Sequence, residues 1–139
     1  MNRSYWEQKS HSAAERFAER RQRENEAPRL SAVIPNLESL RLAVEERRGT
    51  WPSATPDGSH IRHVVVPTAP ALFLITCHDP ECRDGGHDVT TLVMRALRAG
   101  EQHFEGTARC YGHVGSADCQ RVIHFVGTAT YRATGDAGR

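Results

Sequence analysis

Long apolar stretches, an export signal and a clear excess of one charge are all missing from this sequence of 139 residues. No apolar run approaches the roughly 18 residues that a transmembrane helix requires. The first segment, Met1–Glu7, has no apolar core of the kind found in secretory signals. We therefore expect a cytoplasmic protein whose cysteines are free thiols or metal ligands rather than disulfides.

The charges nearly cancel, with 18 basic and 17 acidic residues and a formal net charge of +1. Proteins that bind nucleic acid through its phosphates usually carry a clustered excess of positive charge. Nucleic acid is therefore a possible partner that the net charge does not support. We expect no membrane association, and the composition leaves the oligomeric state open. A protein partner or a larger assembly is the expected binding target.

Several motifs that carry enzyme chemistry are absent as well. The sequence contains no His-Glu-x-x-His, no His-x-Glu paired with Pro-Cys-x-x-Cys, no Cys-x-x-Cys and no Gly-x-Ser-x-Gly. These absences argue against the common zinc hydrolases and deaminases, dithiol oxidoreductases and serine hydrolases. A binding role is the first expectation. A zinc-dependent enzyme or a zinc/thiol redox switch acting on a small molecule is the alternative.

Residues 1–30 have the composition of a polar arm, either helical or disordered. Ser12 is placed to cap a short helix from Ala13 to Arg21, whose apolar stripe is too thin to bury much surface. The same arm mixes aromatic and basic side chains, which suits contact with a partner. Its candidate partner-binding residues are Trp6, Phe17, Arg20 and Arg21.

Residues 31–58 are predicted to hold a short helix followed by a proline-rich linker. Asn36 can cap a helix that runs from Leu37 to Arg48, and Gly49 can end it. The two prolines and the Asp-Gly pair that follow are typical of turns. The expected role of this helix is to pack on the domain that follows it.

Residues 59–133 show the patterns of a small α+β domain, and residues 134–139 are expected to form a disordered tail. The segment from Val89 to Ala99 has apolar residues at helical spacing. Four β-rich segments surround it, so the expected order is ββαββ. The predicted strands are Ile61–Val66, Ala71–Cys77, Gln102–Cys110 and Cys119–Arg132.

The four cysteines fall into two clusters, each at the boundary between an expected strand and a turn. Zinc prefers four ligands such as cysteine thiolates at tetrahedral corners. A domain with a small hydrophobic core also needs a bound metal or another cross-link for stability. Because strand side chains alternate with period two, three of the four thiols would extend the apolar faces of their strands. We expect one structural Zn²⁺ bound by Cys77, Cys82, Cys110 and Cys119.

Two histidines leave the ligand set open. His87 follows the first cluster and His113 lies within the second. Either could replace a cysteine and give a Cys₃His site. Four thiolates are the simplest set and the one we favour.

Cysteine-bearing turns at strand ends resemble the zinc-ribbon class, over about residues 71–132. The pattern departs from that class, because four and eight residues separate the paired cysteines and a helix lies between the two halves. The resemblance implies a protein- or nucleic-acid-contact module, although architecture alone does not define function. We therefore expect a small zinc-binding accessory or adaptor protein, with an N-terminal helical extension, that docks on a larger protein or nucleoprotein assembly.

Overall fold

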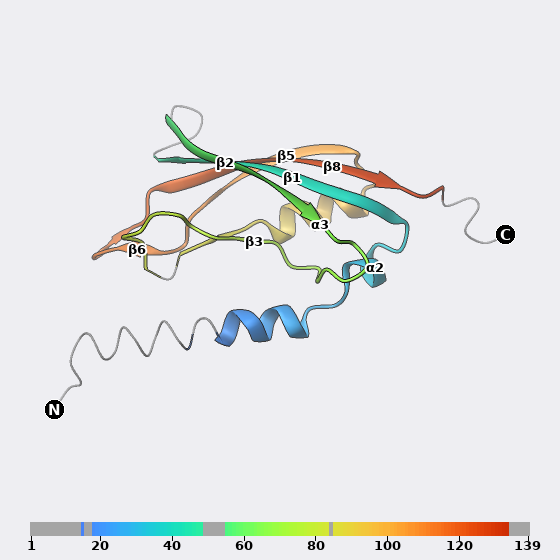
Figure 1. Cartoon of the computed structure of the whole chain (residues 1–139), viewed down its shortest axis with the longest axis horizontal. Coiled ribbons are helices and arrows are strands. Elements are labelled where there is room, and N and C mark those ends of the chain that lie inside the picture. The colour runs from blue at the N-terminus through green and yellow to red at the C-terminus, as the bar shows by residue number, and fades with distance from the viewer. Residues whose placement is uncertain (1–14, 16–17, 49–54, 84, 134–139) are drawn as a thin grey trace.

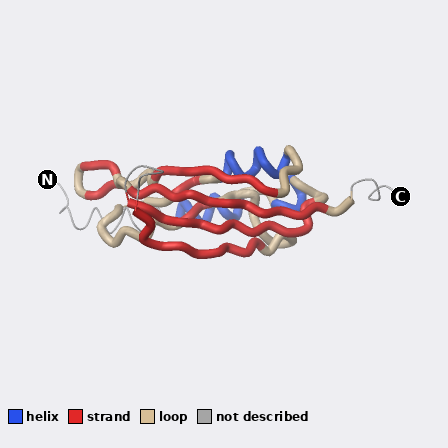
Figure 2. The backbone as a smooth tube through the Cα atoms, turned by 90° about the horizontal axis from the view of Figure 1, so that it is seen from above, coloured by secondary structure: helices blue, strands red, loops and turns tan. Residues whose placement is uncertain are grey.

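The computed structural model describes residue 15 and residues 18–48, 55–83 and 85–133. Between residues 55 and 83, side chains are described from residue 58 onward. A four-stranded antiparallel sheet dominates it, with strand order β2-β1-β8-β5. Its strands are β1 (Leu37–Arg48), β2 (Thr55–Val64), β5 (His103–Arg109) and β8 (Arg121–Tyr131). Figure 2 shows these long strands running side by side.

Shorter elements complete the α+β fold. Residues 18–26 are helical, and α2 (Leu30–Val33) leads into the sheet. Helix α3 (Thr90–Arg98) follows two small strands, β3 (Leu74–Ile75) and β4 (His87–Asp88), which pair with each other. A second small hairpin joins β6 (His113–Val114) to β7 (Ala117–Asp118). In Figure 1, α2, α3 and the β3 segment all lie on the same side of the sheet.

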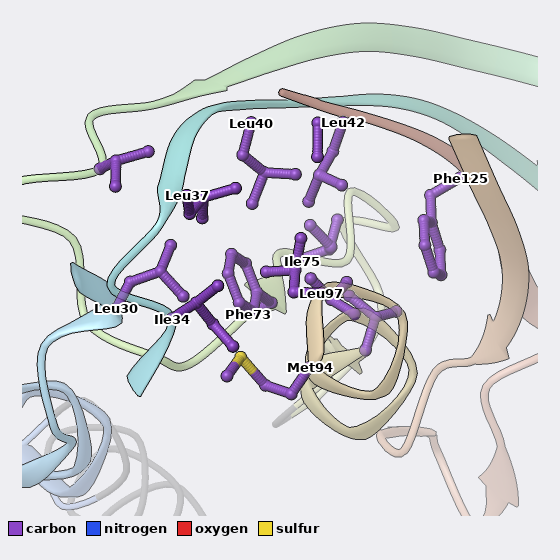
Figure 3. Close-up of a cluster of buried hydrophobic side chains, with 14 of the residues drawn as sticks. Leu30, Ile34, Leu37, Leu40, Leu42, Phe73, Ile75, Met94, Leu97 and Phe125 are labelled. Carbon is purple, nitrogen blue, oxygen red and sulfur yellow. The ribbon is translucent and has the colours of Figure 1, made fainter. Parts of the chain in front are cut away.

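The hydrophobic core lies between that side of the sheet and α3 (Figure 3). Helix α3 buries one apolar face, and the Asp88 carboxylate accepts a hydrogen bond from the Thr90 N–H at its start, at 3.0 Å. The β8 strand alternates buried and more exposed residues, as a half-buried strand should. Core residues include Leu40, Leu42, Val44, Phe73, Ile75, Val93, Leu97, Ile123 and Phe125.

The prediction of a helix from Leu37 to Arg48 is wrong, because this segment is the long strand β1. It lies between β2 and β8 and pairs with both. Leu40, Leu42, Val44 and Glu46 point inward at every second position, which is the spacing of a strand. Residues with good helix propensity thus form a strand because pairing on both edges outweighs a weak local preference.

The expected ββαββ order also needs correction in its first half. The segment predicted as a strand from Ala71 to Cys77 contributes only the short β3, which pairs outside the main sheet. Strand β1 takes the central place instead, and residues 55–58 of the predicted linker begin β2. The predicted helix Val89–Ala99 and the two last predicted strands correspond to α3, β5 and β8. Residues 49–54 and the predicted tail 134–139 lie outside the described residues.

Truncating Leu42 tests the strand assignment of β1. Leu42 is completely buried, whereas its neighbour Arg41 is exposed. We expect Leu42→Ala to lower the free energy of unfolding by about 2–5 kcal/mol, measured by urea denaturation. The matched control Arg41→Ala should change it by no more than about 0.5 kcal/mol. Equal effects of the two substitutions would contradict the alternation.

Candidate metal centre

Two loops bring the cysteines together at the end of the sheet where β6 lies (Figure 1). Cys77 and Cys82 lie in the loop between β3 and β4, whereas Cys110 and Cys119 lie between β5 and β8. The loops are joined by a backbone bridge in which the Arg83 and His113 N–H groups donate to each other's carbonyls, at 2.7 and 3.0 Å. This bridge holds the two cysteine-bearing loops side by side.

The four sulfur atoms lie close enough to share one metal ion. All of them are within 4.8 Å of one another, and the Cys77–Cys119 and Cys82–Cys110 Sγ pairs are 3.9 and 3.6 Å apart. Four sulfurs placed about 2.3 Å from one zinc ion at tetrahedral corners are separated by about 3.8 Å. A disulfide bond would need roughly 2 Å. The observed spacing therefore fits a four-sulfur metal site.

Backbone amides stabilise one of these sulfurs as a thiolate. The N–H groups of Gly86 and Gly112 each donate to the Cys110 Sγ, at 3.3 Å. Burial alone raises the pKa of the Cys110 thiol, but these two hydrogen bonds lower the pKa, and the net shift is downward. These two amide hydrogen bonds therefore favour the thiolate form of Cys110, which is the form that ligates a cation.

The two thiols of the first loop behave differently. Burial and the neighbouring thiols raise the pKa of Cys77 to about 12, and the same causes raise the pKa of Cys82. Crowded thiols resist ionisation when no cation compensates their charge. A divalent cation reverses this preference, because a coordinated thiol loses its proton. The donor set thus fits a metal ion better than four independent thiols.

Glycines allow the loops to approach the sulfurs closely. A Cβ atom added at Gly85 would collide with the Cys82 Sγ and would lie 2.7 Å from the Cys110 Sγ. At Gly112, an added Cβ would lie 2.6 Å from the Cys82 Sγ and 2.5 Å from the Cα of Gly85. Neither glycine has a positive φ, so the missing side chain is what these positions require.

The two histidines considered as alternative ligands lie in different environments. His113 is exposed, pairs with Asp118 at 3.7 Å, and belongs to no cluster of potential ligands among the described residues. His87 is completely buried. It belongs to a second cluster, with Glu46 and Cys77, in which one potential ligand atom of each residue lies within 4.8 Å of the others.

Glu46, which is 4% exposed, is not among the site residues that the sequence predicts. Its carboxylate accepts hydrogen bonds from the Arg121 Nε at 2.9 Å and from the His78 N–H at 3.0 Å. Burial by itself raises the pKa of Glu46, but these bonds and the charge of Arg121 lower it below its ordinary value. The period-two alternation of β1 was the signal that could have placed this side chain inside.

A polar pocket of about 500 Å³ borders this carboxylate. Arg121, also buried, lines it together with Glu46, and the His60 and His78 rings meet edge to face 6.2 Å apart. The pocket lies beside the first cysteine loop, because Thr76 and His78 flank Cys77 and both line it. Its lining comprises Glu46, Gly58, Ser59, His60, Arg62, Leu74, Ile75, Thr76, His78 and Arg121.

The chain matches no protein-family model, no curated protein and no solved structure. Within the described residues, no helix has the length and apolar character needed to span a membrane.

The candidate partner-binding residues divide into two groups. Trp6 and Phe17 lie outside the described residues. Arg20 is half-buried and Arg21 is exposed, both on the helix of residues 18–26. This helix is held to the domain by an ion pair between Arg23 and Asp88 at 3.5 Å.

Proposed function

We propose that this protein is a small zinc-binding accessory module in which one Zn²⁺ is structural and the module docks on a protein partner. The cluster of Cys77, Cys82, Cys110 and Cys119 is the observation that carries the proposal. Zinc held by four thiolates has every tetrahedral position filled by protein, which is the usual arrangement of structural sites. Such an ion would fasten the two cysteine-bearing loops to each other.

Zinc is the ion that best suits this donor set. Four thiolates form a soft ligand set, which excludes magnesium and calcium because both prefer oxygen ligands. Zinc has no redox chemistry and accepts the tetrahedral geometry that the sulfur spacing favours. The ion would hold the loop after β3 against the loop between β5 and β8, so that the end of the sheet is closed.

The face of the sheet opposite α3 supports the docking role. Ala43 of β1 pairs with Ile61 of β2 on one side and with Val126 of β8 on the other. Ile61 and Val126 are 55% and 40% exposed. This apolar row crosses three adjacent strands, and exposed apolar patches are favoured as protein contacts. The near-neutral charge favours a protein over a nucleic acid as the partner.

The docking role is tested with the zinc-loaded full chain as bait in the native cytoplasm. We expect a stoichiometric protein partner, identified by mass spectrometry, that is lost when Ile61→Glu and Val126→Glu are combined. Val65→Glu is the matched control, because Val65 is 65% exposed but follows the end of β2. Capture of the same partner by both variants, or of none by the wild type, would contradict the docking proposal.

A zinc-dependent enzyme acting on a small molecule is the second candidate function. The observation that favours it is the polar pocket beside Cys77, which contains Glu46 and two histidines. A carboxylate and imidazoles are the usual acid–base groups of such enzymes. X-ray absorption at the zinc edge of protein loaded with one equivalent of zinc discriminates the two candidates, because four sulfur neighbours argue for the structural role.

A further inference from the structure

His87 carries a buried nitrogen that lacks a hydrogen-bond partner in the described structure. The side chain is completely buried, and its Nδ1 donates to the Ala108 carbonyl oxygen at 3.0 Å. Because a carbonyl oxygen only accepts, the proton of the neutral ring lies on Nδ1. Nε2 then presents a lone pair, and no donor reaches it. A buried polar atom without a partner costs about 1–3 kcal/mol and calls for an explanation.

Two further ligand groups lie around this imidazole. A carboxylate oxygen of Glu46 and the Sγ of Cys77 are each within 4.8 Å of a His87 ring nitrogen and of each other. Glu46 comes from β1, Cys77 from the loop that follows β3, and His87 from β4. Glu46 is far from the other two in the sequence. Together they offer nitrogen, oxygen and sulfur donors, the mixed set that zinc accepts most readily among common divalent ions.

We infer that Glu46, Cys77 and His87 form a second binding site for a zinc-class divalent cation, which shares Cys77 with the four-sulfur centre. The inference goes beyond the structural zinc, and it depends on that proposal through the shared residue. A thiolate sulfur has enough lone pairs to bridge two metal ions. The cation would supply the missing partner of His87 Nε2.

Each non-sulfur ligand is already held by a second interaction, as metal ligands usually are. The Ala108 carbonyl fixes the tautomer of His87. Arg121 and His78 fix the carboxylate of Glu46, with His78 Nδ1 lying 2.6 Å from Oε2. A carboxylate has about four lone-pair positions, and these three hydrogen bonds leave room for a metal ion.

The charges also favour a second cation. One Zn²⁺ neutralises only half of the charge of four thiolates, whereas two divalent ions neutralise it fully. The carboxylate of Glu46 is balanced separately by the guanidinium of Arg121 at 2.9 Å. A buried cluster with no residual charge avoids the large cost of an uncompensated ion in the interior.

The second site differs chemically from the first because it has three protein ligands rather than four. Structural zinc sites are closed by four protein ligands, and sites with three keep a position for another molecule. Glu46 also lines the polar pocket of about 500 Å³. The second ion would therefore lie at the edge of that pocket, whereas the four-sulfur ion would be enclosed by the cysteine loops.

Cadmium-113 provides a direct test with the unmodified full chain under reducing conditions. We expect two ¹¹³Cd resonances at saturation, one from the all-sulfur site and one from the mixed site. Proton–cadmium correlation should connect the second resonance to a ring proton of His87, and both resonances to the β-protons of Cys77. A single resonance at saturation, or a second one without coupling to His87, would overturn the inference and leave the structural zinc standing.

Zinc stoichiometry by native mass spectrometry gives an independent measurement. We expect two ions for the wild type and one for His87→Gln, in which the amide can still donate to Ala108. The matched control His113→Gln replaces an exposed histidine between Cys110 and Cys119 and should keep two ions. Two ions retained by His87→Gln would overturn the second site. If His87→Gln does not fold, the cadmium spectrum of the wild type decides alone. Absence of the all-sulfur ion would instead contradict the proposed function.

Discussion

Replacing Cys110 with serine is expected to abolish zinc binding at the four-sulfur centre and to destabilise the fold by more than about 4 kcal/mol, the range seen when a bound metal is lost. Cys110 is 6% exposed, and its sulfur accepts the amide hydrogen bonds of Gly86 and Gly112. A hydroxyl group is a poor ligand for zinc beside three thiolates. The other three thiols would then be left crowded together without the four-sulfur ion.

Chelation of the wild-type protein should reproduce this effect. Native mass spectrometry measures the bound zinc, and urea denaturation with and without chelator measures the free energy of unfolding. The chelator should destabilise the wild type more than it destabilises Cys110→Ser, because that variant has already lost the four-sulfur ion. Ser116→Ala is the matched control, since Ser116 is exposed in the same loop. Retention of the wild-type number of zinc ions by Cys110→Ser would contradict the four-cysteine centre.

Gly85→Ala is expected to lower zinc affinity at least tenfold, although it changes no ligand. The added methyl group would collide with the Cys82 Sγ and lie 2.7 Å from the Cys110 Sγ, so at least one sulfur must leave its position. A loss of about 1.4 kcal/mol is sufficient for a tenfold change in affinity. Real displacement of a ligand sulfur should cost more than this.

Competition with a chromophoric zinc chelator measures the zinc affinity of Gly85→Ala and of its control. Gly58→Ala is the matched control, because a Cβ atom at Gly58 would have only an ordinary 3.9 Å contact with the Cβ of Glu46. The control should keep wild-type affinity. Equal affinity of Gly85→Ala and the wild type would show that the loop can move without disturbing the sulfurs. It would argue against a requirement for glycine beside the sulfurs.

The elements near the cysteines were predictable because local patterns and tertiary environment agree there. Helix α3 buries the apolar face that its spacing indicates, and β5 and β8 occupy the segments expected to be strands. The two cysteine clusters lie at strand ends, as their positions predict, and the structure brings their sulfurs together.

Strand β1 was not predictable with the same rules. Leu37, Leu40 and Val44 fit a helical face, and the leucine, arginine and glutamate residues around them favour helices. The same segment also carries Leu40, Leu42 and Val44 at alternate positions. Only the presence of β2 and β8 on its two edges selects the strand, because the backbone groups of a central strand are satisfied by its neighbours.

The amino-acid order alone thus specified the four thiols, their grouping into two turns and the helix between them. These features depend on residues that are close in the chain. The buried carboxylate of Glu46 and its contacts with His78 and Arg121 depend on the fold. Once β1 lies at the centre of the sheet, its inward alternation carries Glu46 beside Cys77 and His87. Residues separated by many positions meet there because strand pairing, rather than local sequence, sets their distance.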